Sequence, residues 1–326
     1  MTLQQLGRRG MTLVEIMIAM VVGVIVMGAA MSFTITTFRG VEHTNLREDV
    51  FRTGRFLGAS LERDVAQAGV AIRSQPRFGT LLAKGDTLVI VSVPYDSLQS
   101  PPFPAGLGLA PVYSMPAGTA TPATPGLGSC GTYCVDVQVA AAMPTDTLQF
   151  GVGSMVQMNV DSERRFLNVT AKRNMGGGRY QITFSAADTL FLHPADWARD
   201  PASAQNLQLR PAETSFQRIT PVMYYRNAQK QVMRSTRLTA GGAPVAEAIA
   251  DSVTTWDVWL FFSDGDSAKM ADPTDADLTN DYGDLASVKV VATLKNVRRD
   301  RNQGVAGQRV FEWRYSPRNL AYERNQ

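Results

Sequence analysis

The most constraining feature of this chain is an apolar run that starts close to the N-terminus. Between Glu15 and Arg39 there are 23 residues without a formal charge, most of them Ile, Val, Met and Ala. A helix of that length rises about 35 Å, which is enough to cross a hydrocarbon core of about 30 Å. Arg8 and Arg9 precede the run, so the positive-inside rule places the N-terminus in the cytoplasm. Residues 11–38 are therefore predicted to form a membrane-spanning helix.

Glu15 lies inside this predicted helix, near its beginning. A carboxylate deep in a membrane helix costs about 2.5–3.5 kcal/mol on insertion scales, so such a residue indicates a function. Gly10, a small residue at the end of a short basic leader, precedes it. If the chain is cut after Gly10, Met11 gains a free amine, and that cation on a neighbouring subunit suits Glu15. A secretory signal peptide or a plain single-pass anchor explains the apolar run but not this order of residues.

The order from Gly10 to Glu15, GMTLVE, resembles the class III signal of type IV pilins and pseudopilins. The resemblance implies that residues 1–10 are a leader removed by a prepilin peptidase and that Met11 becomes a methylated N-terminus. It further implies that Glu15, with Thr12 beside it in the motif, guides assembly of a helical filament. Met11 departs from the family, which has phenylalanine more often at this position.

The second part of the predicted helix is amphipathic. Apolar residues recur there at spacings of four and seven, which places them on one helical face. They are Leu46, Val50, Leu57, Leu61 and Val65. Charged residues, Asp64 among them, are assigned to the rest of the helix surface, and Gly69 suits the position just beyond a helix end. One helix is predicted from about residue 12 to 68, with segment 39–69 packed against a globular domain.

Residues 70–326 are predicted to form a periplasmic β-rich globular domain. Eight runs are typical of strands. They are Thr87–Val93, Val135–Val139, Met155–Val160, Tyr180–Phe184, Ile219–Arg226, Thr254–Phe262, Ser287–Leu294 and Arg309–Trp313. Residues 97–128 are rich in Pro, Gly, Ala and Thr, which predicts an irregular excursion unsuited to a central strand. The predicted fold class is therefore α+β, with a long N-terminal α-helix packed on an antiparallel β-rich domain.

Three later stretches resemble PilW-type minor pilins. Leu57–Gly69 resembles the end of their long helix, Pro244–Asp266 their short helix, strand and Asp-Gly loop, and Tyr282–Leu320 their closing strands. The resemblance implies a minor pilin that primes assembly of a type IV pilus and is incorporated near its tip. A J-type minor pseudopilin of a type II secretion system is the alternative, and a membrane-tethered enzyme or adhesin is a remote one.

The resemblance also implies partners and a location. The partners are prepilin peptidase, an inner-membrane assembly platform, and other minor pilins and the major pilin through the N-terminal helix. The location is the bacterial inner membrane, with the C-terminal domain in the periplasm, and then the pilus fibre. The net charge of +3 falls to +1 when Arg8 and Arg9 leave with the leader, so no specific nucleic acid is expected. Motility, adhesion and DNA uptake all stay open as the cellular task.

The sequence does not suggest an enzyme. It contains only two histidines, His43 and His193, and neither belongs to a hydrolase or metalloprotease motif. Carboxylates are plentiful, but no catalytic pair can be assigned from their positions.

Two further features concern covalent and metal chemistry. Cys130 and Cys134 are separated by three residues, which favours a local disulfide over a zinc or redox site. An Asp-rich stretch offers hard oxygen ligands of the kind that Ca²⁺ prefers. Its candidate ligands are Asp264, Asp266, Asp275, Asp277 and Asp281. A solvated acidic loop and a calcium site both account for this composition, and no other cofactor is expected.

Overall fold

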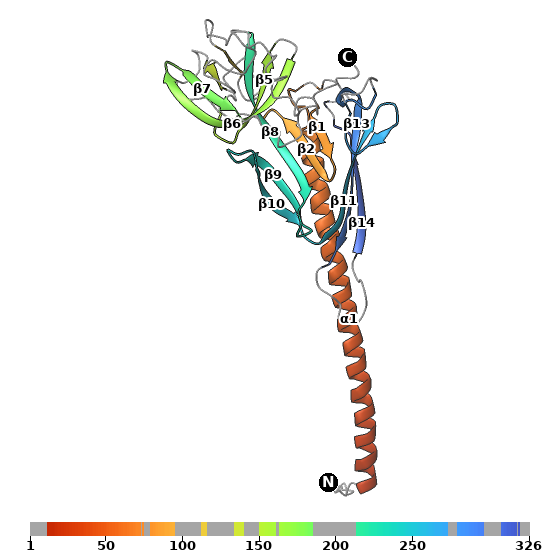
Figure 1. Ribbon diagram of the computed structural model, residues 1–326. Coiled ribbons are helices and arrows are strands. Elements are labelled where there is room, and N and C mark those ends of the chain that lie inside the picture. The colour runs from red at the N-terminus through yellow and green to blue at the C-terminus, as the bar shows by residue number, and fades with distance from the viewer. Residues whose placement is uncertain are drawn as a thin grey trace, which may run out of the picture. The chain divides into compact units, whose positions relative to one another are not determined.

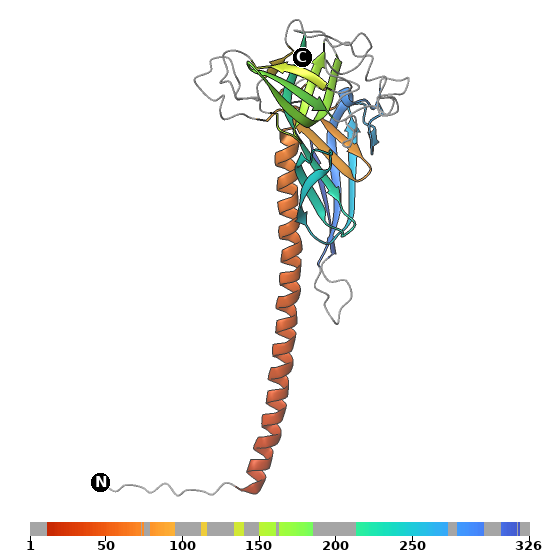
Figure 2. The ribbon, with the colours of Figure 1, turned by 60° about the vertical axis from the view of Figure 1, so that its left-hand side comes forward.

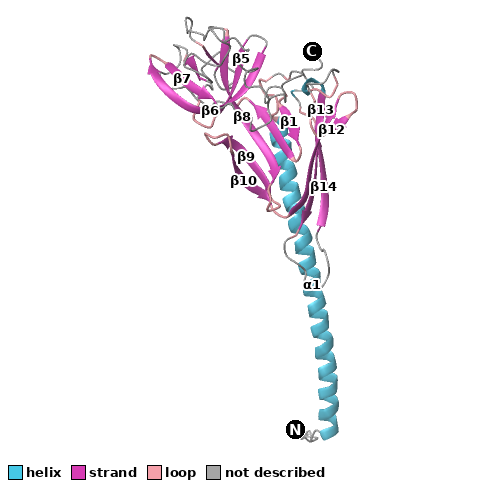
Figure 3. Cartoon of the chain, viewed as in Figure 1, coloured by secondary structure: helices cyan, strands magenta, loops and turns pink. Residues whose placement is uncertain are grey.

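The computed structural model describes residues 12–72, 74, 79–94, 112–115, 134–139, 150–160, 163–184, 213–272, 279–296, 308–317 and 319. The chain divides into two units, Met1–Arg52 with Asn296–Gln308, and Thr53–Lys295 with Arg309–Gln326. One long helix is followed by antiparallel strands, which confirms the predicted α+β class (Figure 3).

The helix α1 spans Leu13–Ala66 without a break, as predicted, and its 54 residues correspond to about 80 Å (Figure 1). All five side chains of the predicted apolar face are buried, from Leu46 to Val65. Gly69 follows the helix with φ of +75°, the left-handed conformation that glycine adopts readily at this position. The prediction for Asp64 was wrong, because this side chain is only 3 % exposed.

Two glycines of α1 make room for aromatic side chains of the last strand. A Cβ added to Gly54 would overlap the ring of Phe311, and one added to Gly58 would overlap the indole of Trp313. The two rings stack with centroids 5.5 Å apart and planes 8° apart. Tyr315, two residues further on, donates a hydrogen bond of 2.7 Å to the carbonyl of Gly58. This glycine notch therefore lets the C-terminal strand approach the helix backbone closely.

In the described part of the chain, fourteen strands follow the helix. In chain order they are β1 Leu81–Lys84, β2 Thr87–Ser92, β3 Val112–Ser114, β4 Cys134–Gln138, β5 Met155–Val160, β6 Glu163–Gly176, β7 Arg179–Phe184, β8 Thr214–Arg226, β9 Val232–Leu238, β10 Pro244–Ala250, β11 Val253–Phe262, β12 Ser267–Ala268, β13 Leu285–Lys295 and β14 Gln308–Tyr315. A short 3-10 helix at Tyr282–Asp284 precedes β13. Each of the eight predicted strands is present, with differences of one or two residues at the ends except for Ile219–Arg226, since β8 begins five residues earlier at Thr214.

Two parts of the sequence prediction are corrected. Pro244–Ala250, expected as a short helix, is strand β10, which pairs with β9 along its length. Val112–Ser114, inside the predicted irregular excursion, is strand β3, and it pairs with β8 on one side and β4 on the other. Tyr113 is only 1 % exposed, because its side chain lies in a core that the flanking Pro-rich composition does not reveal.

The strands form a ten-stranded sheet and a four-stranded sheet. Within the larger sheet, β1, β2, the second half of β8, β9 and β10 lie in that order. The smaller sheet has the order β12-β11-β13-β14. We term these two groups of strands, together with helix residues 53–66, the body.

The remaining strands close on themselves. Thr214–Ile219, the first half of β8, pairs with β3 on one edge and with β5 on the other. The pairings β3–β4, β4–β7, β7–β6 and β6–β5 complete a ring of six antiparallel strands. We term this ring the barrel. Figures 1 and 2 show its yellow-green strands β5, β6 and β7 curling together, apart from β11 and β13.

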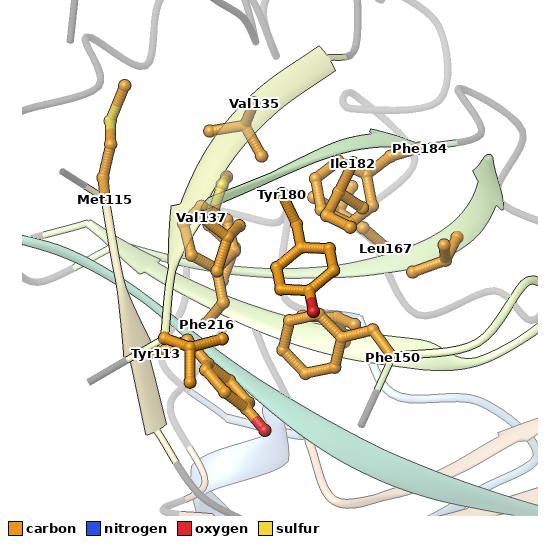
Figure 4. Packing of buried hydrophobic residues seen from close by; sticks show 14 residues of the cluster. Tyr113, Met115, Val135, Val137, Phe150, Leu167, Tyr180, Ile182, Phe184 and Phe216 are labelled. Atoms are coloured by element: carbon orange, nitrogen blue, oxygen red, sulfur yellow. The ribbon is translucent and has the colours of Figure 1, made fainter. Parts of the chain in front are cut away.

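The barrel is filled by its own side chains. On β4 and β7 alternate residues point inward, with Val135, Val137, Tyr180 and Ile182 all buried. Figure 4 shows these side chains gathered with the ring of Phe150. The core also contains Tyr113, Met115, Val139, Val156, Met158, Leu167, Val169, Phe184 and Phe216. A barrel of this size has an interior just wide enough for side chains, so it is a packed core.

Candidate functional site

The start of α1 is built from Thr12 and Glu15. Thr12 stands immediately before the helix and Glu15 is its third residue. The backbone N–H of Glu15 donates to Thr12 Oγ1 at 3.3 Å, and the backbone N–H of Thr12 donates to Glu15 Oε2 at 3.2 Å. Such reciprocal bonds form a capping box, which satisfies donors that a helix N-terminus otherwise leaves unpaired. Both predicted assembly residues are thus held together by their own chain.

The carboxylate of Glu15 is available for a further cation. Thr12 Oγ1 also donates to Glu15 Oε2 at 3.3 Å. An ionised carboxylate has about four acceptor positions on its two oxygens, so these contacts leave capacity for another donor. The N-terminal end of a helix dipole favours a negative charge here as well. The capping box fixes Glu15 near the end of the helix, where an amine of another chain can approach it.

The helix that follows Glu15 presents an apolar surface. Large apolar side chains from Leu13 to Val41 are exposed, including Val24 at 72 % and Phe33 at 75 %. Exposed apolar surfaces of this extent mark contacts with a membrane or with other proteins. Within the described residues, α1 is one helix that could cross a membrane by its length and composition.

Threonine hydroxyls in this segment bond to the helix itself. Thr34 Oγ1 donates to the carbonyl of Ala30 at 2.8 Å, and Thr36 Oγ1 donates to that of Ser32 at 2.9 Å. Thr37 bonds to Phe33 in the same way. Because these hydroxyls are satisfied within the helix, they add little cost in an environment without water.

The processing and disulfide residues are only partly within the structure. Gly10 and Met11 lie outside the described residues, so cleavage and methylation there stay predictions. Cys134 is the buried first residue of β4. Cys130 lies outside the described residues, and its pairing with Cys134 also stays a prediction.

The candidate calcium ligands are not gathered in the described part of the chain. Asp264 and Asp266 are exposed in the turn between β11 and β12, where Asp264 Oδ1 accepts a bond of 2.9 Å from the backbone N–H of Asp266. Asp281 is buried just before the 3-10 helix. Asp275 and Asp277 lie outside the described residues. No group of three or more His, Cys, Asp or Glu side chains that could hold a metal occurs among the residues described, so the calcium site stays a prediction.

A second polar site joins α1 to the body, and the sequence analysis missed it. Asp64 accepts a hydrogen bond from the Tyr224 hydroxyl of β8. Arg234 of β9 donates to the same carboxylate through Nε at 2.7 Å and Nη2 at 3.2 Å. Asp64 follows Leu61 by three residues and therefore lies on the buried stripe. That spacing was the available signal for this cluster, which we term the Asp64 latch.

The latch stabilises the neutral form of Tyr224 and the charged form of Arg234. Burial, followed by the hydrogen bond to Asp64, raises the pKa of Tyr224 well above its usual value. The hydrogen bond to Asp64 is the main cause that raises the pKa of Arg234. The latch therefore keeps one negative and one positive charge together, which suits a structural contact.

The comparisons with known proteins concern the N-terminal segment. Residues 6–31 match the family described as the prokaryotic N-terminal methylation motif, and this segment contains Gly10, Met11, Thr12 and Glu15. No curated protein matches the chain, and no solved structure matches it. The motif, a class III prepilin signal, supports a type IV pilin-like or pseudopilin protein, and with the apolar N-terminal helix it suggests membrane anchoring.

Proposed function

We propose that this chain is a minor pilin of the PilW type, which primes assembly of a type IV pilus and is incorporated near its tip. The observation that carries the proposal is the position of Glu15. It is held by Thr12 at the start of a helix whose following apolar surface is exposed, within a matched methylation motif. A charge at that place needs a partner when the helix is surrounded by apolar material.

The partner in this proposal is the amine created by cleavage. Prepilin peptidase cuts after Gly10, and Met11 becomes the N-terminal residue of the mature chain. The Met11 amine of one subunit then meets Glu15 of another, so their charges are neutralised in the apolar filament core. The exposed residues that follow Glu15 pack against equivalent helices of other minor pilins and of the major pilin.

The subunit in this proposal is structural and has no catalytic activity of its own. Its C-terminal domain faces the periplasm before assembly and the outside of the fibre afterwards. Assembly on a type II secretion pseudopilus, as a J-type subunit, uses the same helix chemistry. Fractionation of the two filament types distinguishes these assignments.

A substitution at Gly10 tests the processing step. Gly10→Phe introduces a bulky side chain at the cleavage point, so we expect the chain to keep its leader. An immunoblot against cells that lack the peptidase measures the result, and the variant band should comigrate with the uncut precursor. Normal processing of Gly10→Phe would contradict the proposal.

A substitution at Glu15 tests the assembly step. Glu15→Ala should be cleaved normally but be depleted at least tenfold from sheared filaments, because an apolar side chain cannot neutralise the amine. Glu62→Ala is the matched control, since Glu62 is an exposed acidic residue of the same helix. Wild-type protein found in pseudopili and absent from pili would favour the type II secretion assignment. Equal incorporation of Glu15→Ala and wild type would exclude the pairing role.

A further inference from the structure

The barrel lies between two strands that are adjacent in the body. β2 and β8 pair from Thr87 opposite Tyr225 to Ser92 opposite Thr220. The chain therefore leaves the body after β2 and returns beside the same point in β8. Removing the intervening segment would leave β2 and β8 as neighbours, in the arrangement of an antiparallel hairpin.

The barrel has its own hydrophobic core and its own strand pairing, as a separate folding unit does. Among the described residues, the members of its hydrophobic cluster all lie between Tyr113 and Phe216, and none comes from α1 or from the other strands of the body. The six strands pair in a ring, in which β3 and β4 meet at the single register pair of Ser114 and Gln138, so their ladder partners are other strands of the barrel. Aromatic contacts add to this core, with Tyr113 edge-on to Phe150 at 4.9 Å between centroids. A domain needs such a core of its own to fold independently.

Among the described residues, barrel and body are joined along β8 and at a lateral contact where Gly153 of the barrel lies against the backbone of Leu238 and Thr239. β8 passes from one to the other, and over Thr220–Val222 its ladder partners among the described residues are those of β2 alone. Pro221, which cannot donate a backbone hydrogen bond, stands at this transition. Asn168 of β6 adds a lateral contact, because its amide donates to the carbonyls of Thr239 and Ala240 at 3.3 Å each.

From this we infer that the barrel is an independently folding insertion that filament assembly does not require. The assembly part of the inference rests on the proposed function, whereas the folding part does not. Filament contacts are then made by α1 and the body.

Hydrogen exchange of the full-length chain in detergent micelles tests the folding part. We expect two groups of slowly exchanging amides, one in β4–β7 and one in β11 and β13, with exchange rates that differ at least about tenfold and with separate denaturant dependences. A single common rate and a single denaturant dependence for both groups would overturn the inference.

Two substitutions that introduce a buried charge also test whether barrel and body fold independently. This test does not require the two parts to differ in stability in the wild type. Ile182 of β7 and Val258 of β11 are both fully buried. Ile182→Asp should raise exchange about 100-fold or more across the barrel while body amides change less than about threefold, because a buried charge disrupts its own core. Val258→Asp should produce the opposite pattern. Loss of body protection in Ile182→Asp would overturn the inference.

An excision variant tests the assembly part. Residues 94–218 are replaced by Asn-Gly, which favours a two-residue hairpin between β2 and β8. We expect this variant, and Ile182→Asp, to be found in sheared filaments at within about twofold of the wild-type amount. The inference is overturned if wild type is found in filaments but Ile182→Asp is not, although the body of this variant remains folded. If wild type itself is absent from filaments, the proposed function and the assembly part both fail, and the exchange data decide the folding part alone.

Discussion

The two ends of α1 have the same backbone conformation and opposite surfaces. From Leu13 to Phe38 the helix is apolar and its large side chains are exposed, whereas from Thr53 to Ala66 one stripe of apolar side chains, Leu57, Leu61 and Val65, is buried and Phe56 is exposed. The second segment also makes two specific contacts with strands of the same chain, the glycine notch and the Asp64 latch. One segment has its partner within the chain, and the other needs a partner outside it. Substitutions at the two ends should therefore change different measurements.

Asp64→Ala is one of the two substitutions with the largest expected effect. Removing this carboxylate leaves the partly buried Arg234 charge with only the exposed Glu247 carboxylate, 3.9 Å away, as a counter-ion, which should lower the free energy of unfolding by about 3 kcal/mol. Urea unfolding of the full-length chain in micelles, followed by tryptophan fluorescence, measures the loss. Glu62→Ala is the control and should change the free energy by less than about 0.5 kcal/mol. Equal effects of the two substitutions would show that the latch does not stabilise the fold.

Apolar truncations compare the two segments directly. Leu61→Ala creates a cavity at a fully buried position and should lower the free energy of unfolding of the body by about 3 kcal/mol. Val24→Ala removes methyl groups at a position that is 72 % exposed, so body stability should stay within about 0.5 kcal/mol of wild type. A loss of body stability in Val24→Ala would contradict the division between the segments.

Alkaline pH should loosen the second segment selectively. Burial, followed by the nearby charge of Glu62, raises the pKa of Tyr315 to about 12, and burial also raises that of Tyr224. A tyrosine whose pKa is raised in the folded state stabilises the fold fully below its unfolded-state pKa of about 10. This stabilisation is lost as the pH rises through the folded-state pKa. Urea midpoints between pH 9 and 12 should therefore fall. In the Tyr224→Phe, Tyr315→Phe double variant the urea midpoint should fall less steeply with pH. An unchanged slope would show that these two tyrosines do not cause the loss of stability.

The smallest expected effect is that of Thr12→Ala. Loss of the capping hydroxyl should destabilise the first turn of α1 by about 1 kcal/mol and leave body unfolding unchanged. Amide exchange of residues 13–16 in micelles should rise about fivefold, with Thr12→Ser as the conservative control. Unchanged exchange in Thr12→Ala would show that the capping box does not order the helix start.

The sequence predicted the elements whose pattern is local. The apolar run and the spacing of Leu57, Leu61 and Val65 specify the helix, and alternation in β11 and β13 specifies two strands. β10 was expected as a helix from the resemblance to PilW-type minor pilins. Its Ala and Glu residues do favour helices, but backbone pairing with β9 outweighs that preference. β6 was missed because its described side chains do not alternate in burial: residues 166–169 are all buried and residues 171–176 are all exposed, although β5 and β7 flank the strand.

The candidate site was predictable only where one segment contains it. Thr12 and Glu15 are three residues apart, so their contact follows from helix geometry. The partners of Asp64, by contrast, come from 160 and 170 residues away in the sequence. The closure of the barrel likewise depends on β8 meeting β3 and β5, which no local pattern encodes.

The glycine notch sets an order of events during synthesis. Gly58 is among the first residues of the body to be made, and Tyr315, which bonds to its carbonyl, is 257 residues later in the chain. Contacts this far apart close large loops and form late. The helix backbone at Gly54 and Gly58 therefore stays uncovered until the last strand is released from the ribosome. A chain truncated before residue 311 would keep most of its strands yet leave this groove open to proteases.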